Sequence, residues 1–329
     1  MIGFFASNLD IRVGSYRIWV NDLKNYFNEI GITTKIFNNL YEVGNFETVI
    51  FSKADAVLAN NVKQTLPHIK VGIINLSCDN TKNKSDFVVV GSIEEKISLS
   101  WHKNVFIFPL IENIFQNQQI KTHRENNEQF LLCYHGNTAH LSRFENGLKQ
   151  AIEEINSTIN VELTIITGDE KFNWVEGRPN INNIIFKKWD IDTIKQNILA
   201  CDVGLVPNVS DVSQNAEYTK KINNSSGLYN TDFVIRMKNK SNAGRSFVFH
   251  QLGIPVVSDL TPSNLHILGD PDCGHVAFNK NSWKKSLEDL IDYKKRNFIA
   301  KNAKVQFDRL YDPKKWAVRL YKNIMELEI

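Results

Sequence analysis

RMKNKSNAGRSFVFHQLGIPVVS, residues 236–258, is the stretch of sequence that decides the fold. It opens with a cationic loop and continues into a run typical of a helix, with Ala243, Phe247 and Leu252 facing inward. Gly253 is placed to end that helix, and the apolar run at 254–258 predicts a buried strand. A helix that ends at a glycine and leads into a buried strand is part of a βαβ unit. The stretch therefore indicates a parallel sheet covered by helices.

The same alternation of short apolar runs and amphipathic stretches extends along most of the chain. Strands are expected at residues 1–6, 32–37, 48–51, 56–59, 71–74, 87–90, 105–108, 130–134, 161–167, 184–186, 202–206 and 254–258. Helices are expected at residues 14–30, 138–155, 191–200, 242–252 and from 282 onward, the last with Asp312 as N-cap and Pro313 at its first position. The pattern predicts an α/β protein with two Rossmann-like, doubly wound domains.

Two polar stretches interrupt this alternation. The one at residues 109–128 separates two βα series and is the predicted domain boundary. We expect an N-terminal domain at 1–115, a C-terminal domain at 116–310 and a final helix at 311–329. The second stretch, at 208–232, is rich in Asn and Ser, and its length predicts a loop that is either functional or disordered. If it is functional, it is a lid or an acceptor loop.

Composition and charge exclude several classes of protein. The 329 residues are 42% hydrophobic and 23% charged with a net charge of +3, which is typical of a globular chain and does not favour nucleic acid as a partner. No apolar run is long enough to cross a membrane, and the N-terminus lacks the basic start of a signal peptide, so we expect a cytoplasmic protein. The four cysteines lack zinc-binding spacing, which predicts reduced and mostly buried thiols at Cys78, Cys133, Cys201 and Cys273.

The C-terminal tail is rich in cations. Among them are Lys284, Lys285, Lys294, Lys295, Arg296, Lys301, Lys304, Lys314 and Lys315. Such charges usually form a solvated helix face, and the alternative is peripheral contact with the inner face of a membrane.

The turn after the expected strand at 130–134 carries one candidate site. Gly136 allows a ligand to approach the backbone closely, and His135, His140 and Arg143 bring three potential cations to one helix start. The alternative is that the two histidines have a purely structural role and bind no ligand. No carboxylate lies at a spacing from these histidines that is typical of metal ligands, which disfavours a metal site.

The loop before the helix at 242–252 is the strongest candidate. Lys238, Lys240 and Arg245 flank Ser241 and Asn242, the expected N-cap residues. Cations at a helix N-terminus cost about 0.3–1 kcal/mol each, so their accumulation suggests an anion, and a diphosphate fits best. The alternative is a solvated, basic start to a core helix.

Two further turns give weaker signals. Gly14, Ser15 and Arg17 follow the first expected strand and suit an anion or a sugar hydroxyl. The turn lacks the GxGxxG pattern, which disfavours a nicotinamide site. Ser263 and Asn264 follow the strand at 254–258 and offer donors to a phosphate or a sugar.

At these residues the sequence resembles the GT-B superfamily of nucleotide-sugar glycosyltransferases, and most nearly the glycogen-synthase-like group that builds bacterial surface glycans. The resemblance rests on Gly14-Ser15, on Tyr134-His-Gly-Asn137, on Ala200-Cys-Asp-Val-Gly-Leu-Val-Pro207 and on Lys240-Ser-Asn242 followed by Gly253-Ile-Pro-Val-Val257. It implies an acceptor-binding N-terminal domain, a C-terminal domain that binds the nucleotide sugar, and a last helix that packs on the first domain.

The patterns and the resemblance together nominate two groups of residues. The candidate catalytic residues are His135, His140, Arg143, Lys240 and Arg245. The candidate nucleotide-sugar contacts are Gly14, Ser15, Arg17, Gly136, Asn137, Pro207, Lys238, Ser241, Asn242, Ser263 and Asn264.

The sequence departs from the family in one respect. The pair of glutamates that relatives often carry before the Gly-x-Pro-Val-Val stretch is missing, so the stereochemical outcome of transfer stays open. The Asp-x-Asp strings at 190–192 and 270–272 are expected at a helix start and a turn, so neither a metal nor another cofactor is expected.

The expected partners are a nucleotide sugar and a glycan or lipid-linked acceptor. The rival functions are a nucleotide-sugar epimerase or sugar phosphorylase of the same fold, and a non-catalytic two-domain sugar-binding protein.

Overall fold

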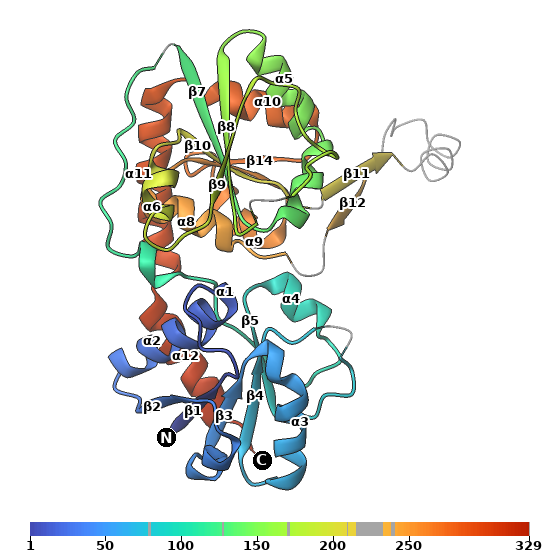
Figure 1. Ribbon diagram of the computed structural model, residues 1–329, viewed down its shortest axis with the longest axis vertical. Helices are drawn as coiled ribbons and strands as arrows, with labels where there is room; N and C mark the ends of the chain where they lie inside the picture. The colour runs from blue at the N-terminus through green and yellow to red at the C-terminus, as the bar shows by residue number, and fades with distance from the viewer. Residues whose placement is uncertain are drawn as a thin grey trace, which may run out of the picture. The chain divides into compact units, whose positions relative to one another are not determined.

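The computed structural model describes residues 1–77, 80–126, 128–169, 172–208, 210–214, 233–237 and 241–328. The chain divides into two compact units, each built around its own sheet (Figure 1). Unit 1 comprises Met1–Gln118, Asn242–Val248 and Phe307–Ile329, and unit 2 comprises Gln119–Ser241 and Phe249–Gln306.

Unit 1 contains a six-stranded parallel sheet in the order β2-β1-β3-β4-β5-β6. Its strands are β1 (Ile2–Phe5), β2 (Thr34–Phe37), β3 (Thr48–Phe51), β4 (Lys70–Ile74), β5 (Phe87–Val90) and β6 (Val105–Ile107). The central strands are almost entirely buried, as β-branched and aromatic runs covered on both faces require.

The helices of unit 1 cover this sheet. They are α1 (Gly14–Tyr16), a π-helical segment (Arg17–Asp22), α2 (Leu23–Glu29), α3 (Ala56–Thr65), α4 (Ile93–Ser98) and α12 (Pro313–Met325). Asp312 caps α12 by accepting the backbone N–H of Lys314 at 2.9 Å. Leu320 and Ile324 of α12 pack in one buried cluster with Phe27 of α2.

The strand expected at 56–59 is wrong, because these residues open α3. The apolar run is only four residues long, too short to distinguish a strand from a helix by its pattern. In the structure Ala59 and Val62, three residues apart, turn one face of α3 inward.

Unit 2 contains a second six-stranded parallel sheet in the order β14-β13-β10-β7-β8-β9. Its strands are β7 (Gln129–His135), β8 (Asn160–Thr167), β9 (Asn183–Lys188), β10 (Val203–Val206), β13 (Val256–Asp259) and β14 (His275–Ala277). Its helices are α5 (Leu148–Asn156), α6 (Ile194–Leu199), α9 (Pro262–Leu268) and α10 (Lys280–Asp289). Two further helices, α8 (Gly244–Leu252) and α11 (Tyr293–Leu310), are divided between the two units. The two parallel sheets confirm the predicted α/β architecture.

The helix expected at 138–155 is broken in two. A 3-10 helix spans Thr138–Glu145 and α5 begins only at Leu148, because Gly147 lies between them with φ at +94°. A Cβ atom at Gly147 would lie 2.4 Å from the backbone nitrogen of Lys280, so both the conformation and the space require glycine.

The loop expected at 208–232 begins with regular structure. β11 (Ser210–Gln214) pairs antiparallel with β12 (Phe233–Met237). The rest of the expected loop, residues 215–232, lies outside the described residues.

A buried ionic cluster anchors the start of unit 2. The carboxylate of Asp202 lies 3.6 Å from the side-chain nitrogens of Lys121 and Arg296 and 3.7 Å from His123 Nδ1. Arg296 is 1% exposed and also donates to the carbonyls of Leu290 and Ile291, so it is not part of a solvated tail face.

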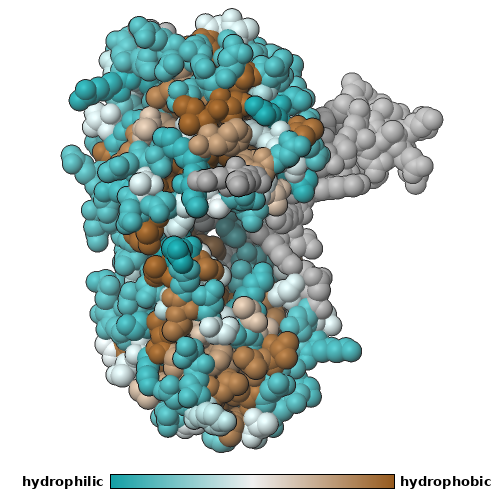
Figure 2. All heavy atoms as spheres, viewed as in Figure 1, coloured by the Kyte–Doolittle hydropathy of each residue, from teal (hydrophilic) through white to brown (hydrophobic). Residues whose placement is uncertain are grey.

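The cysteines and the surface agree with a globular chain. Cys133, Cys201 and Cys273 are free and buried, whereas Cys78 lies outside the described residues. Within the described ranges, no helix has the length and apolar character needed to cross a membrane. Hydrophilic residues cover much of the visible face, with smaller hydrophobic areas among them (Figure 2).

Candidate functional site

The strand order of unit 2 locates its ligand-binding edge. From β7 the chain builds β8 and β9 on one side, and then places β10, β13 and β14 on the other side. The carboxyl ends of β7 and β10 therefore flank a topological switch point, where doubly wound sheets bind their ligands. His135 ends β7, Gly136 and Asn137 follow it, and Pro207 follows β10. This edge therefore carries several of the candidate residues identified from the sequence.

The turn after β7 has the geometry that its glycine suggested. Gly136 has φ at +139° and its N–H donates to the carbonyl of Ile166 at 3.0 Å. Asn137 caps the 3-10 helix, because its Oδ1 accepts the N–H of Ala139 at 2.8 Å. The hydroxyl of Tyr134 donates to the Asn137 carbonyl at 2.6 Å. These bonds fix the turn from both sides.

The basic residues near this turn differ in exposure. His135 is only 6% exposed, and its ring packs edge-to-face against Phe249 with centroids 4.9 Å apart. His140 and Arg143 are half-buried on the 3-10 helix. Residues three apart in a 3-10 helix share one side, so the side chains of His140 and Arg143 project from the same side of this helix, directly after the turn.

Hydrogen bonds fix the loops after β10 and β13. The N–H of Asn208 donates to Asp259 Oδ2 at 2.6 Å, which ties the end of β10 to the end of β13. Asn264 is 1% exposed and its Nδ2 donates to Ser258 Oγ at 2.5 Å, so this amide holds α9 against β13. Ser263, at the second position of α9, stays half-buried.

The first turn of α8 belongs to unit 1, whereas Phe249 onward belongs to unit 2. Asn242 Oδ1 accepts the N–H of Gly244, the first residue of α8, at 3.2 Å. The N-cap position itself is taken by Ala243, whose carbonyl accepts the N–H of Phe247 at 2.9 Å, so the expected N-cap lies one residue too early. Ser241 is 2% exposed and Arg245 is half-buried. Lys238 and Lys240, the other two cations nominated here, lie outside the described residues.

Glu95 is a residue that the sequence analysis missed. Its Oε1 accepts a hydrogen bond from Asn242 Nδ2 at 3.1 Å, and its Oε2 accepts one from the N–H of Gly91 at 2.6 Å. Burial raises the pKa of Glu95, and the two hydrogen bonds oppose that shift. Ser92-x-x-Glu95 has the spacing of a capping box, which predicts the start of α4 but not the partner 147 residues away.

Gly14, Ser15 and Arg17 lie near the switch point of unit 1, between β1 and β3. Gly14 opens α1 and Ser15 is exposed. Arg17 is 4% exposed, pairs with Glu112 Oε2 at 2.8 Å and donates to the carbonyl of Ile11 at 3.2 Å. Burial raises the pKa of Glu112 and Arg17 opposes this shift. The Arg17 guanidinium is thus engaged in holding the loop before α1.

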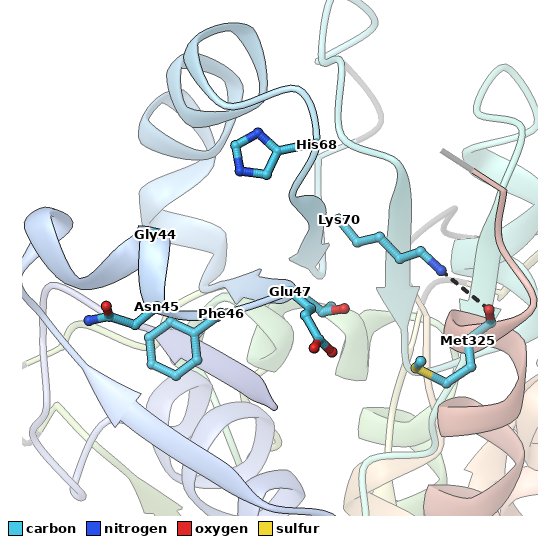
Figure 3. A pocket seen from close by; sticks show the side chains of 8 residues that line it. Gly44, Asn45, Phe46, Glu47, His68, Lys70 and Met325 are labelled. Carbon is cyan, nitrogen blue, oxygen red and sulfur yellow. Dashed lines mark hydrogen bonds between the residues drawn. The ribbon is translucent and has the colours of Figure 1, made fainter.

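One hollow of unit 1 lies at the opposite edge of its sheet. A pocket of about 480 Å³ is formed at the amino ends of β3 and β4, where Glu47, His68 and Met325 surround it (Figure 3). Lys70 points across it and donates to the carbonyls of Ile324 and Met325, both at 3.2 Å. Lys70 therefore stabilises the C-terminus of α12.

The described part of the chain contains no group of three His, Cys, Asp or Glu side chains arranged to hold a metal ion.

Sequence comparisons find no relative, because no protein-family model and no curated protein matches the chain. Solved structures match nearly all of it. Sucrose-phosphate synthase from Thermosynechococcus elongatus has a TM-score of 0.67 at 11% identity over 98% of both chains. HepE from Anabaena, in complex with UDP-glucose, has a TM-score of 0.62 at 9% identity over 99% of both chains. An alpha-glucosyltransferase in complex with UDP and DNA has a TM-score of 0.61 at 10% identity, again over 99% of both.

At identities of 9–11% this likeness concerns the fold. It agrees with the two parallel sheets, each wound in both directions from a switch point. The chain therefore has the fold of the GT-B glycosyltransferases, with two Rossmann-like sheets.

Proposed function

We propose that the chain is a glycosyltransferase that moves a sugar from a nucleoside diphosphate donor to a glycan or lipid-linked acceptor. The observation that carries the proposal is the switch point of unit 2. There the Gly136 turn, the half-buried pair His140 and Arg143, and the end of β10 lie on one edge, in a fold shared with a protein solved in complex with UDP-glucose.

The proposed reaction is a substitution at the anomeric carbon of the donor sugar. The bond from this carbon to the diphosphate oxygen breaks, and a bond to an acceptor hydroxyl oxygen forms. The acceptor hydroxyl loses its proton, and the nucleoside diphosphate leaves with the electron pair of the broken bond. The protein must stabilise the negative charge that develops on the leaving diphosphate.

The chain offers fixed positive groups for this purpose. Arg245 is the second residue of α8, whose N-terminus carries partial positive charge. In our proposal Arg245 binds the diphosphate together with Lys238 and Lys240. His140 and Arg143 face the donor phosphates from the turn after β7. We propose that these groups act without a metal, on the cytoplasmic side of the cell.

The first experiment is a thermal-shift panel of UDP, GDP, ADP and dTDP and of their sugars, followed by product analysis with the donor that binds. A ligand of the native state raises its melting temperature by mass action. We expect one nucleotide to stabilise the chain, and its sugar to be transferred or slowly hydrolysed in buffer containing EDTA. If EDTA abolishes turnover, the metal-free proposal is wrong. Tight sugar binding without turnover of any donor contradicts transferase activity, and an epimerised donor supports the rival enzyme.

The Arg245→Ala variant tests the proposed leaving-group role. Loss of one group that stabilises the transition state costs roughly 100-fold or more in turnover. Arg178→Ala is the matched control, because Arg178 is an exposed arginine of unit 2 outside the proposed site. Turnover of Arg245→Ala within a few-fold of the wild-type rate would remove Arg245 from the mechanism.

A further inference from the structure

Unit 1 contains a second pocket that belongs to no part of the proposed donor site. It has a volume of about 420 Å³, and its lining includes Thr81, Asn83, Ser85, Trp101, Lys103 and Glu328. Asp86 and Asn104, which also line it, directly precede β5 and β6. The pocket therefore lies at the amino edge of the sheet, whereas the donor of a Rossmann-like domain binds at the carboxyl edge.

Trp101 gives this pocket an aromatic wall. Its side chain is 36% exposed, and its ring packs edge-to-face on His102 with centroids 5.6 Å apart. The indole thus leaves part of its apolar area uncovered in a pocket whose other walls are polar. A ligand that pairs an apolar face with a polar edge gains most from such a surface, because the ring covers its face while polar groups bind its edge.

The pocket is held rigid by hydrogen bonds between its walls. His102 Nδ1 accepts the N–H of Asn104 at 3.2 Å, and His102 Nε2 donates to the carbonyl of Ser85 at 3.0 Å. Burial lowers the pKa of His102, so the neutral ring with its proton on Nε2 matches both bonds. Asn104 Nδ2 donates to the carbonyl of Asp86 at 2.8 Å. A site fixed in this way loses little conformational entropy on binding.

The polar groups of the pocket suit a neutral ligand with many hydroxyls. In the part of the chain that the structure describes, Trp101 Nε1, Lys103 Nζ and Asn104 Oδ1 have no hydrogen-bond partner, and the buried Asn83 Nδ2 has none either. These atoms include both donors and an acceptor, as hydroxyl groups require. Lys103 and Glu328 carry opposite charges, and the third charged group of the lining, Asp86, forms an ion pair with Lys63 at 2.9 Å. The pocket therefore favours neither an anion nor a cation.

We propose that this pocket is a saccharide-binding subsite, in which the Trp101 indole covers one face of a neutral sugar ring. The surrounding amides, Lys103 and Glu328 bind the hydroxyls at the edge of the ring. The proposal rests on the proposed function for the source of its ligand, because an acceptor glycan supplies such sugars. The chemistry of the pocket itself selects the class of ligand.

The test uses the full chain and three neutral trisaccharides, namely maltotriose, cellotriose and triacetylchitotriose. We expect saturation-transfer NMR to detect at least one of them, with a Kd of about 1 mM. Trp101→Ala should weaken that binding at least about ten-fold, and Trp101→Phe, which keeps an aromatic face, should restore part of it. Tyr41→Ala is the matched control, because Tyr41 is an aromatic side chain of unit 1 that is 96% exposed and outside the pocket.

Three results would overturn the proposal: no saturation transfer to any of the three sugars at about 5 mM, equal binding by wild type and Trp101→Ala, or displacement of the sugar by UMP. Hydrolysis of the nucleotide sugar without acceptor separates this proposal from the proposed function. Trp101→Ala should leave that hydrolysis unchanged, and Arg245→Ala should leave trisaccharide binding unchanged. The two assays therefore distinguish failure of the saccharide subsite from failure of the proposed transferase activity.

Discussion

The carboxyl edges of the two sheets use similar polar residues in different ways. In unit 1 they bind one another: Arg17 pairs with Glu112, and Glu95 accepts a hydrogen bond from Asn242. In unit 2 the edge carries a glycine turn at positive φ, with His140 and Arg143 half-buried beside it. Charged groups locked in internal pairs stabilise a loop, whereas cations held at a helix start attract an anion. In our proposal the donor diphosphate therefore binds at the edge of unit 2, beside the turn after β7.

Removal of the Arg17 guanidinium is expected to lower the free energy of unfolding more than any other change considered. Arg17→Met leaves the Glu112 carboxylate buried without its cation, which costs about 3–5 kcal/mol of unfolding free energy. Urea unfolding at pH 7 measures this loss. Arg12→Met is the matched control, because Arg12 forms an exposed pair with Asp10, and its midpoint should not move.

The double variant Arg17→Met/Glu112→Leu sharpens this prediction. It removes both charges, so most of the lost stability should return. If Arg17→Met instead leaves stability intact and abolishes donor binding, Arg17 binds the nucleotide sugar as the sequence suggested. The contrast between the two edges would then be wrong.

Arg245→Lys tests the proposed diphosphate role of the first turn of α8, which belongs to unit 1. Lysine keeps the charge but loses the planar fork that binds two phosphate oxygens. We expect turnover to fall about ten-fold or more, less than for Arg245→Ala, with the melting temperature within about 2 °C of wild type. Steady-state release of the nucleoside diphosphate measures the rate. Equal turnover by Arg245→Lys and wild type would show that charge alone matters at this position.

The sequence predicted the sheets well because their strands are recognisable locally. Buried strands such as β5 and β13 are continuous β-branched or aromatic runs, and parallel topology follows from their alternation with helices. β14 was missed because three residues carry no periodicity. The break at Gly147 was missed because the contact that requires glycine comes from the backbone of Lys280, far along the chain.

The form of the turn after β7 was predictable from the sequence, whereas the partners of the polar side chains were not. Gly136 and Asn137 follow a buried strand, and their turn has the expected form. The partners of Arg17, Asn242 and Asn264 could not be inferred, because Glu112, Glu95 and Ser258 come into contact with them only through the folded chain. Sequence identifies residues able to bind a ligand, whereas tertiary structure shows which of them are already engaged.

The hydrogen bond between Glu95 and Asn242 is the next test. Glu95→Ala removes the acceptor of both Asn242 Nδ2 and the Gly91 N–H, and a hydrogen bond to a charged group contributes about 1.5–3 kcal/mol. We expect this loss in chemical unfolding, together with a raised KM for the donor because the first turn of α8 loses its support. Glu94→Ala, on the same helix, is the control for KM. An unchanged KM in Glu95→Ala would confine Glu95 to a stabilising role.

The last prediction concerns His250, near the C-terminal end of α8, and the pH dependence of stability. Its ring is 1% exposed, neither ring nitrogen has a hydrogen-bond partner in the described residues, and burial lowers its pKa to about 3. Between pH 6.5 and 3 the unfolded chain therefore binds a proton at His250 that the folded chain does not bind. The free energy of unfolding is therefore independent of His250 titration above pH 6.5. Below pH 6.5 this titration lowers the free energy of unfolding by about 1.4 kcal/mol per pH unit. His250→Leu should remove that part of the slope, so its advantage over wild type in urea unfolding should grow from pH 7 to pH 5. If the difference in unfolding free energy between His250→Leu and wild type stays constant from pH 7 to pH 5, His250 binds a proton in the folded state. The C-terminal end of α8 would then contain a partner for that charge.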